Sequence, residues 1–325
     1  MTVIADIPEA LLDVYSDDII REAFPRVTFM EFAIIRDDLM ISKGETLVFT
    51  KYADLGGDPE ILETATPVDD TLSAGQISLK VTEYIKSAAV SEKLASLSWD
   101  DVLGEAAIQL GRHYTLWGPD NLLKQTAQLG AATTLYGGGA ASRAAVQPTG
   151  VFDVALVRAG ALALQNKNVP KFHRAGDAFY VCVCHPKQLS NLRQDADWEE
   201  AHKYVDPSNI YNGEAGRFEG VVFISTTQVY NGKEADATDP IFGPTYLDDG
   251  NGQNALSVAA TPANLAELYM ATMFGDSYYA LGRQKPVEVR QKVVAGYGRT
   301  HGLAWYAIYG AAILNPTHGV SIETA

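Results

Sequence analysis

The sequence predicts an α+β protein in which a mixed helix and strand module is inserted into a second, discontinuous domain. A strong amphipathic helix signal covers residues 98–117, and short apolar strands alternate with helices from about residue 150 to 285. Further strands are expected within 46–85 and 287–309, on either side of that module. The strands that flank the module are therefore assigned to one domain that the module interrupts.

The composition is that of a folded, acidic protein. A chain of 325 residues has room for about two domains. The formal charge of −15 argues against nonspecific nucleic-acid binding as the main task, because phosphate contacts need clustered Lys and Arg. It also argues against attachment to an anionic membrane. The first residues lack the basic and apolar regions of a secretory signal, so we expect the protein to be made in a cytoplasm.

Residues 1–40 are expected to form an acidic N-terminal arm. Apolar residues are scattered through this segment, and only 19–24 has the pattern of a short helix. The segment does not have the features of an independent domain, so we expect it to pack against another part of the protein.

Residues 41–92 are predicted to form a long two-stranded ribbon with a large tip loop. Thr46–Tyr52 is rich in β-branched and aromatic residues, and Ile77–Ile85 alternates between apolar and polar positions. The polar stretch 53–76 separates them. An isolated ribbon is only marginally stable and so long a loop is unusual in a compact domain, so we expect a partner surface. An ordinary hairpin at a sheet edge is the alternative.

The strongest helix signal begins at Ser98, which is a suitable N-cap with Asp101 three residues later. Gly118-Pro119 is expected to end or kink this helix before a continuation over 120–128. Apolar residues recur at helical spacing on one stripe, which predicts core packing. The stripe consists of Trp99, Val102, Leu103, Ala106, Ala107, Leu110, Tyr114 and Trp117.

The rest of the chain alternates between short elements. The segment 137–150 is rich in Gly, Ala and Ser and is interpreted as a linker or a mobile loop. Pro316 and a short polar tail are expected to follow the last strand. The predicted helices are 152–165 and one that begins at His185-Pro186, and the predicted strands are 179–184, 220–225, 267–271, 287–294 and 304–309.

The sequence contains no phosphate-binding glycine loop, dinucleotide-binding glycine motif, nucleophile elbow or His-Glu-x-x-His zinc motif. Cys182 and Cys184 are interpreted as small core residues, since structural zinc takes four ligands. Asp248–Gly252 is interpreted as a turn, because it lacks the downstream bidentate Glu of a calcium loop. We therefore expect no catalytic residue, metal or cofactor. A catalytic triad assembled only in space stays an alternative.

Four short runs give the chain a resemblance to a known family. They are Gly44-Glu45-Thr46, then Pro67–Leu72, then His185-Pro186 with Leu189, Leu192, Asp195 and Trp198, and finally Tyr211–Val221. In this order and spacing they resemble the tailed-phage major capsid proteins with the Hong Kong 97 type fold.

The resemblance covers almost the whole chain and implies five parts. They are an N-terminal arm at 1–40, an extended β-ribbon loop at 41–92, a spine helix with peripheral domain at 93–145, an inserted axial domain at 146–285 and the return strands of the peripheral domain at 286–325.

The resemblance implies a structural protein of the virion and not an enzyme. Copies would self-assemble into hexamers and pentamers of an icosahedral head that encloses double-stranded DNA. The other expected partners are a separate scaffolding protein and a portal, with DNA held only by nonspecific proximity and with no membrane, and the presence of a decoration protein stays open. The ribbon would contact a neighbouring subunit through Leu47, Phe49, Ile77, Leu79 and Val81.

Two other functions stay open from the sequence. An encapsulin-type compartment shell has the same fold, and it is expected to enclose protein cargo in place of DNA. A soluble α/β enzyme would carry a site that no sequence motif reveals. No covalent crosslink between a ribbon lysine and a neighbouring asparagine is predicted, because no acceptor can be identified.

Overall fold

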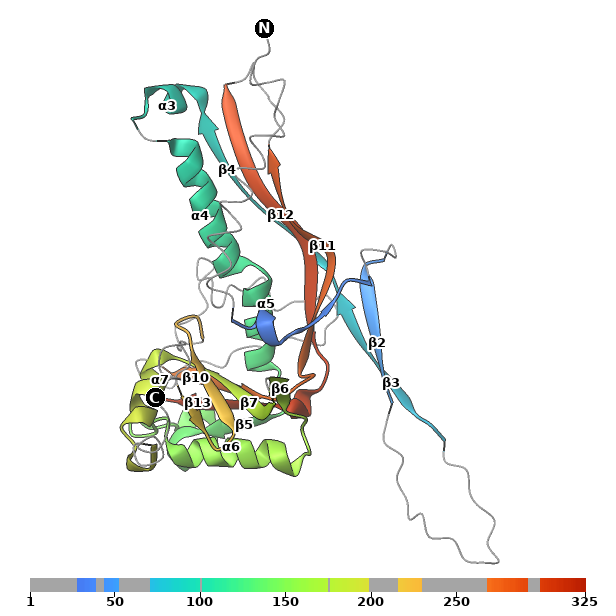
Figure 1. Cartoon of the computed structure of the whole chain (residues 1–325), viewed down its shortest axis with the longest axis vertical. Coiled ribbons are helices and arrows are strands. Elements are labelled where there is room, and N and C mark those ends of the chain that lie inside the picture. Colours follow the sequence, from blue (N-terminus) through green and yellow to red (C-terminus); the bar gives the residue numbers. More distant parts are fainter. Residues whose placement is uncertain are drawn as a thin grey trace, which may run out of the picture.

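The computed structural model describes residues 28–38, 44–52, 71–99, 101–174, 176–198, 216–229, 268–291 and 299–325, and the structural statements below concern these residues. They form two sheets, two consecutive helices that run between the sheets, and a projecting two-stranded ribbon (Figure 1). Outside them lie the helix predicted at 19–24, most of the arm and of the tip loop, residues 211–215 and the turn at Asp248–Gly252.

A four-stranded sheet occupies the upper half of the molecule in Figure 1. Its order is β1-β11-β12-β4, with β1 parallel to β11 and the other pairs antiparallel. Strands from both ends of the chain therefore share this sheet. In sheet order they are Ile34–Arg36, Tyr279–Gln291, Thr300–Ile313 and Thr82–Ser91.

Helix α4 (Val102–Trp117) packs on one face of this sheet through Leu110, which lies in a cluster with Trp305. Helix α5 (Pro119–Leu129) follows after a bend at Gly118. A Cβ atom at Gly118 would collide with the carbonyl oxygen of Tyr114, so this bend requires glycine. The predicted break and continuation of the helix are confirmed.

The predicted start of this helix at Ser98 is wrong. The Ser98 N–H donates to the Leu94 carbonyl oxygen and closes a preceding helix, α3 (Glu92–Leu97). The N-cap of α4 is Asp101, whose side chain accepts the N–H of Gly104 at 3.1 Å. Trp99, which was placed on the buried stripe, therefore lies between the helices and is fully exposed.

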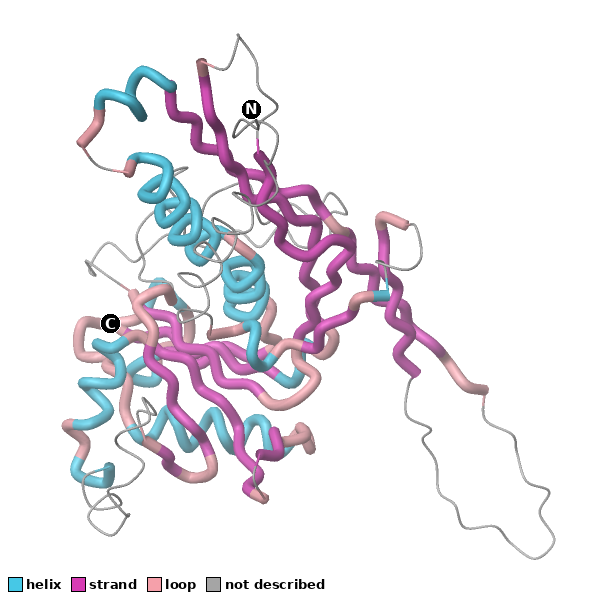
Figure 2. The backbone as a smooth tube through the Cα atoms, turned by 45° about the horizontal axis from the view of Figure 1, so that its top comes forward, coloured by secondary structure: helices cyan, strands magenta, loops and turns pink. Residues whose placement is uncertain are grey.

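The second sheet has seven strands in the order β5-β13-β10-β7-β9-β8, with β6 paired to β7 (Figure 2). Neighbouring strands are parallel in the pairs β5–β13 and β7–β9 and antiparallel elsewhere. In that order, with β6 last, the strands are Thr133–Tyr136, Gly319–Thr324, Tyr269–Phe274, Asp177–Cys184, Val221–Ser225, Arg217–Phe218 and Phe172–Arg174.

Helices cover both faces of this sheet. On one face, α6 (Val154–Asn166) and α7 (Pro186–Arg193) enclose a core that contains Cys182 and Cys184. On the other face, α5 contributes Leu123 to a second core. The predicted helix start at His185-Pro186 is confirmed, since His185 caps α7. Because the central strands are buried on both sides, they read as continuous apolar runs.

Residues 137–150 form a connecting loop, as predicted, with short 3-10 turns at Gly137–Gly139 and Arg143–Ala145, and Val146 in it packs fully buried against Met270. The prediction of a polar tail after Pro316 is wrong. The tail after Pro316 is strand β13, in which every residue is buried. The polar side chains of this strand give it a sequence pattern unlike that of a strand buried on both faces.

The strand predicted at 287–294 also differs from its predicted limits. Strand β11 begins at Tyr279, and irregular pairing between Arg283 and Glu288, around Pro286, interrupts its pattern. Strand β13 joins the seven-stranded sheet, while β12 joins the four-stranded sheet. The end of the chain therefore contributes to both sheets.

Candidate intersubunit interface

The ribbon consists of β2 (Thr46–Tyr52) and β3 (Ala74–Lys80), an antiparallel pair that projects away from the rest of the molecule (Figures 1 and 2). In the part of the chain that the structure describes, these strands pair only with each other. The second strand predicted at 77–85 is in fact divided at Val81 between β3 and β4. The ribbon is thus a continuation of one edge strand of the four-stranded sheet.

The root of the ribbon is built into its own subunit. Leu79 is 1% exposed and lies in a cluster with Val81 and Ala312. Two glycines make room for it, because a Cβ at Gly282 would lie 2.7 Å from Leu79 Cδ2 and one at Gly310 would lie 3.1 Å from the same atom. The root is therefore a close-packed joint that fixes where the ribbon leaves the sheet.

The five residues predicted to contact a neighbour divide into two groups. Leu79 and Val81 are buried, and the neighbours that the structure shows for them belong to the same chain. Leu47, Phe49 and Ile77 are only partly buried against that cluster. A contact of these residues with another subunit stays a prediction.

Sequence reasoning missed a different set of exposed apolar side chains on the ribbon. Val48 is 50% exposed and Tyr52 is 59% exposed, on the face of β2 opposite to Leu47. Leu72, just before β3, is 62% exposed. The alternation within β2 predicts two faces, and the less apolar one, with Val48 and Tyr52, is the face exposed in the single subunit.

One polar contact ties the ribbon to the body of the subunit, and two others join the two sides of the ribbon at its base. The Lys51 ammonium donates to the side-chain oxygen of Asn315 at 2.5 Å, across 264 positions in the sequence. Lys80 forms an ion pair with Glu45 at 3.2 Å, and the N–H of Val81 donates to the Glu45 carbonyl oxygen at 3.0 Å. These contacts are exposed and individually weak, so they orient the ribbon more than they stabilise it.

The segment 28–38 forms a strap across both sheets. Phe29 is buried, and its carbonyl oxygen accepts the hydroxyl of Tyr279 at 2.8 Å. Phe32 packs edge-on against Phe172 of the seven-stranded sheet at 5.4 Å between ring centroids. At the other end, Asp37 forms a bidentate pair with Arg283. The end of the predicted arm is thus fastened to the body of the subunit.

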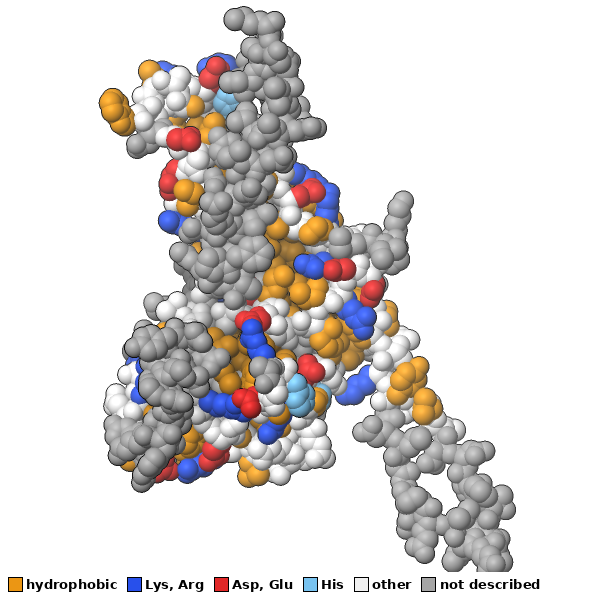
Figure 3. Space-filling view, in the orientation of Figure 1, with side chains coloured by type: hydrophobic (Ala, Val, Ile, Leu, Met, Phe, Trp, Pro, Cys, Tyr) orange, Lys and Arg blue, Asp and Glu red, His pale blue; other side chains and the backbone are white. Residues whose placement is uncertain are grey.

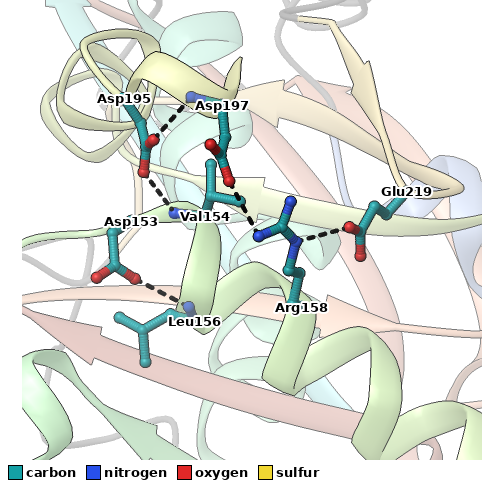
Figure 4. A network of polar contacts seen from close by, with 7 residues as sticks. All are labelled: Asp153, Val154, Leu156, Arg158, Asp195, Asp197 and Glu219. Atoms are coloured by element: carbon teal, nitrogen blue, oxygen red, sulfur yellow. Dashed lines mark hydrogen bonds and ion pairs between the residues drawn. The ribbon is translucent and has the colours of Figure 1, made fainter. Parts of the chain in front are cut away.

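A polar network joins α6 to the segment after α7 and to the turn before β9 (Figure 4). Arg158 donates to Glu219 at 2.7 Å and to Asp197 at 3.0 Å. Asp195 accepts the backbone N–H of Val154 at 3.2 Å. In this network one arginine is shared between two carboxylates and a third carboxylate binds the start of α6, so the network fastens these segments together.

Burial holds the two thiols and one histidine of the interior neutral near pH 7. Burial raises the pKa of both thiols, that of Cys184 to about 12, so neither is a thiolate nucleophile near neutral pH. Burial lowers the pKa of His113 to about 4, beside Trp117 and Trp305.

Within the described ranges, no three His, Cys, Asp or Glu side chains are grouped to hold a metal ion. No described helix is long and apolar enough to cross a membrane.

Comparisons with known proteins match this architecture to viral shells. A family model described as phage capsid protein matches residues 128–265. The capsid of Ralstonia phage GP4 is 18% identical, with a TM-score of 0.69 over 92% of this chain and 91% of that chain. The head of Helicobacter pylori bacteriophage KHP40 is 14% identical, with a TM-score of 0.68 over 92% and 91%. No curated protein matches the sequence.

The chain therefore has the Hong Kong 97 type capsid fold, as predicted from the sequence. The family match and the shared fold together support a phage capsid protein and confirm the resemblance. The matched proteins are structural capsid proteins and not enzymes, which agrees with the predicted class.

Proposed function

We propose that this chain is the major capsid protein of a tailed phage, and that its copies assemble into hexamers and pentamers of an icosahedral head around double-stranded DNA. The observation that carries the proposal is the ribbon. Its two strands have no third strand in the described chain, and Val48 and Tyr52 on β2 and Leu72 just before β3 are exposed. An isolated two-stranded ribbon is marginally stable in water, so a neighbouring copy is expected to cover it.

The parts of the structure suit the proposed roles. The four-stranded sheet with α4 and α5 would be the peripheral domain and spine, and the seven-stranded sheet would be the axial domain. Strand β13 then belongs to the axial domain and not to the peripheral one. The strap at 28–38 would be the end of the N-terminal arm. Leu47, Phe49 and Ile77 would extend the ribbon contact beyond its exposed face.

The remaining partners follow from the same proposal. Assembly in the host cytoplasm would use a separate scaffolding protein and a portal. The formal charge of −15 makes a specific DNA site on this chain an unfavourable arrangement, so packaged DNA would be held by enclosure alone.

Electron microscopy of the chain co-expressed with the other head proteins of its phage tests the proposal. Closed icosahedral particles that contain DNA are expected. Particles that contain protein cargo and no DNA would favour a compartment shell. Folded monomers that never assemble under these conditions would contradict both shell functions.

A further inference from the structure

Three polar side chains are enclosed where α5 meets the seven-stranded sheet. Gln128 on α5, Thr272 on β10 and Ser321 on β13 are each at most 2% exposed. Figure 3 shows acidic and basic side chains close together on the outside of this half of the molecule, where solvent reaches them. The three enclosed side chains carry no charge, and bulk solvent does not reach them.

These side chains lie on the same side of the sheet. Thr272 and Ser321 are directly paired in the register of β10 and β13, so their side chains share one face. Met273, the next residue of β10, packs in the core on the α6 side, so Thr272 lies on the α5 side. Gln128 reaches the same strand from α5, because its side-chain nitrogen donates to the Met270 carbonyl oxygen at 3.3 Å.

Hydrogen bonds within the described part of the chain leave this group incomplete. The hydroxyls of Thr272 and Ser321 and the side-chain oxygen of Gln128 have no partner among the described residues. A buried polar group without a hydrogen bond lowers stability, and most such groups in native proteins have a partner. Three incomplete groups on one side of one contact therefore indicate a bound molecule that completes them.

Water fits this set of groups better than a cation does. Each hydroxyl can donate or accept, whereas the amide oxygen of Gln128 only accepts. A water molecule that donates to Gln128 and to one hydroxyl, and accepts from the other hydroxyl, makes about the usual number of bonds for a buried water. The nearest carboxylate on this face of β13 is Glu323, and its ion pair with Arg143 already neutralises it. A cation would therefore gain little there.

We propose that a buried water molecule bridges Thr272, Ser321 and Gln128 and is part of the folded subunit. The bridge joins three segments that lie far apart in the sequence. Helix α5 also packs against the four-stranded sheet, since its Leu123 shares a core with Tyr309 of β12. The water therefore completes the contact through which α5 links the two sheets. The inference concerns the single subunit, so the folded full-length chain is sufficient for its tests.

Replacing Thr272 by Val tests the water through stability. Valine keeps the shape of threonine, so only the hydroxyl is lost. If that hydroxyl bonds to water, the urea midpoint should fall about as far as in Thr126→Val, which removes a buried hydroxyl that donates to the Leu122 carbonyl oxygen at 2.8 Å. Removal of a hydroxyl that has no partner leaves the midpoint unchanged or raises it, and that result would overturn the inference.

X-ray hydroxyl-radical footprinting of the wild-type subunit tests for the water directly. The pulse converts bound water into hydroxyl radicals in place, and these radicals oxidise the side chains beside it. Met270 lies two positions from Thr272 on the same face of β10, so it should be oxidised although it is buried. Met273 is also buried but packs in the apolar core on the α6 side, which makes it the matched control. Oxidation of Met270 no greater than that of Met273 would contradict the buried water.

A double variant links the two tests. Thr272→Val with Ser321→Ala removes both hydroxyls, so oxidation of Met270 should fall to the level of Met273 while circular dichroism matches the wild type. Oxidation of Met270 that persists in this variant would mean that radicals reach it by another route, and the inference would then be wrong.

Discussion

Asp120 binds the backbone of Phe29, with one carboxylate oxygen accepting the Phe29 N–H at 2.7 Å. The same oxygen accepts the N–H groups of Met30 at 2.8 Å and Thr28 at 3.2 Å. Asp120 lies at the start of α5, and it is buried. This one side chain therefore satisfies three consecutive donors of the strap and fixes where the strap enters the body of the subunit.

Replacing Asp120 by Ala should detach the strap. The three N–H groups would lose their acceptor in a buried place, which costs about 1–3 kcal/mol of unfolding free energy or more. Hydrogen exchange of residues 28–30 should become faster, as measured by mass spectrometry. Asp101→Ala is the matched control, because it removes an exposed carboxylate that caps α4 and should leave exchange at 28–30 unchanged. Equal protection in the Asp120→Ala variant and the wild type would contradict the anchor.

Asp120 should also make stability depend on pH. Burial raises the pKa of its carboxyl above the ordinary 3.8, and the three N–H donors offset this only in part. In the folded protein the carboxyl therefore keeps its proton at pH values where the unfolded chain has lost it. Relative to Asp120→Asn, the wild type should lose stability as the pH rises from about 4 through the folded pKa. Urea unfolding of both proteins between pH 4 and 7 measures the difference, and parallel curves would contradict the raised pKa.

Leu79 is expected to stabilise the subunit through the joint at the root of the ribbon. Leu79→Ala should lower the unfolding free energy by about 2–5 kcal/mol, because it leaves a cavity between the ribbon and the four-stranded sheet. Leu72→Ala, at a 62% exposed position, should change it by less than about 0.5 kcal/mol. Denaturant unfolding gives both values. Replacing Leu79 by a charged residue would place a charge in this buried cluster and destabilise the subunit itself, so that variant cannot test assembly.

Gly282 offers a sharper test of the same joint. A Cβ at this position would collide with Leu79 Cδ2, so Gly282→Ala alone should be destabilising. In a Leu79→Ala background the colliding atom is absent, and the penalty of the second substitution should shrink. A double-mutant cycle with additive effects would show that the two residues are not coupled.

Arg143 and Glu323 form a buried bidentate ion pair, with N···O distances of 2.7 and 2.9 Å. Removing one partner leaves a buried charge, so Glu323→Ala should cost about 3–5 kcal/mol of unfolding free energy. Arg158→Ala breaks exposed pairs with Glu219 and Asp197 and should cost less than about 1 kcal/mol. Denaturant unfolding compares the two. Equal losses would mean that the burial of the Arg143 pair has no energetic consequence.

The helices and the apolar strands could be predicted from the sequence because their patterns are local. The start of α7 at His185-Pro186 and strand β7 follow from a cap and an apolar run. Strand β13 could not be predicted in this way. Its Glu323 is neutralised by Arg143, 180 positions away, and no local pattern shows that such a residue is buried.

At the candidate interface, too, the packing of the ribbon depends on residues that are far away in the sequence. Alternation in β3 correctly indicated an apolar face, but the partner of that face was inferred to be another subunit. The structure places Leu79 against Gly282 and Gly310, which lie in strands more than 200 positions later. The signal in the sequence is a glycine inside each of the two strands, since glycine within a strand often marks a close approach.

The exposed face of the ribbon is expected to decide assembly without affecting the fold. Replacing Val48 and Tyr52 by Ser removes side chains that are at least half exposed, so unfolding free energy should change by less than about 1 kcal/mol. If a neighbouring copy covers them, each lost apolar contact weakens assembly by about 1.5–3 kcal/mol. Sedimentation of co-expressed head proteins should then show free subunits in place of heads. Ile85→Ser, at a 58% exposed position on β4, is the matched control and should assemble normally. Heads at wild-type yield from the double variant would mean that another part of the ribbon makes the contact, and Leu47, Phe49 and Ile77 would then be the residues to replace.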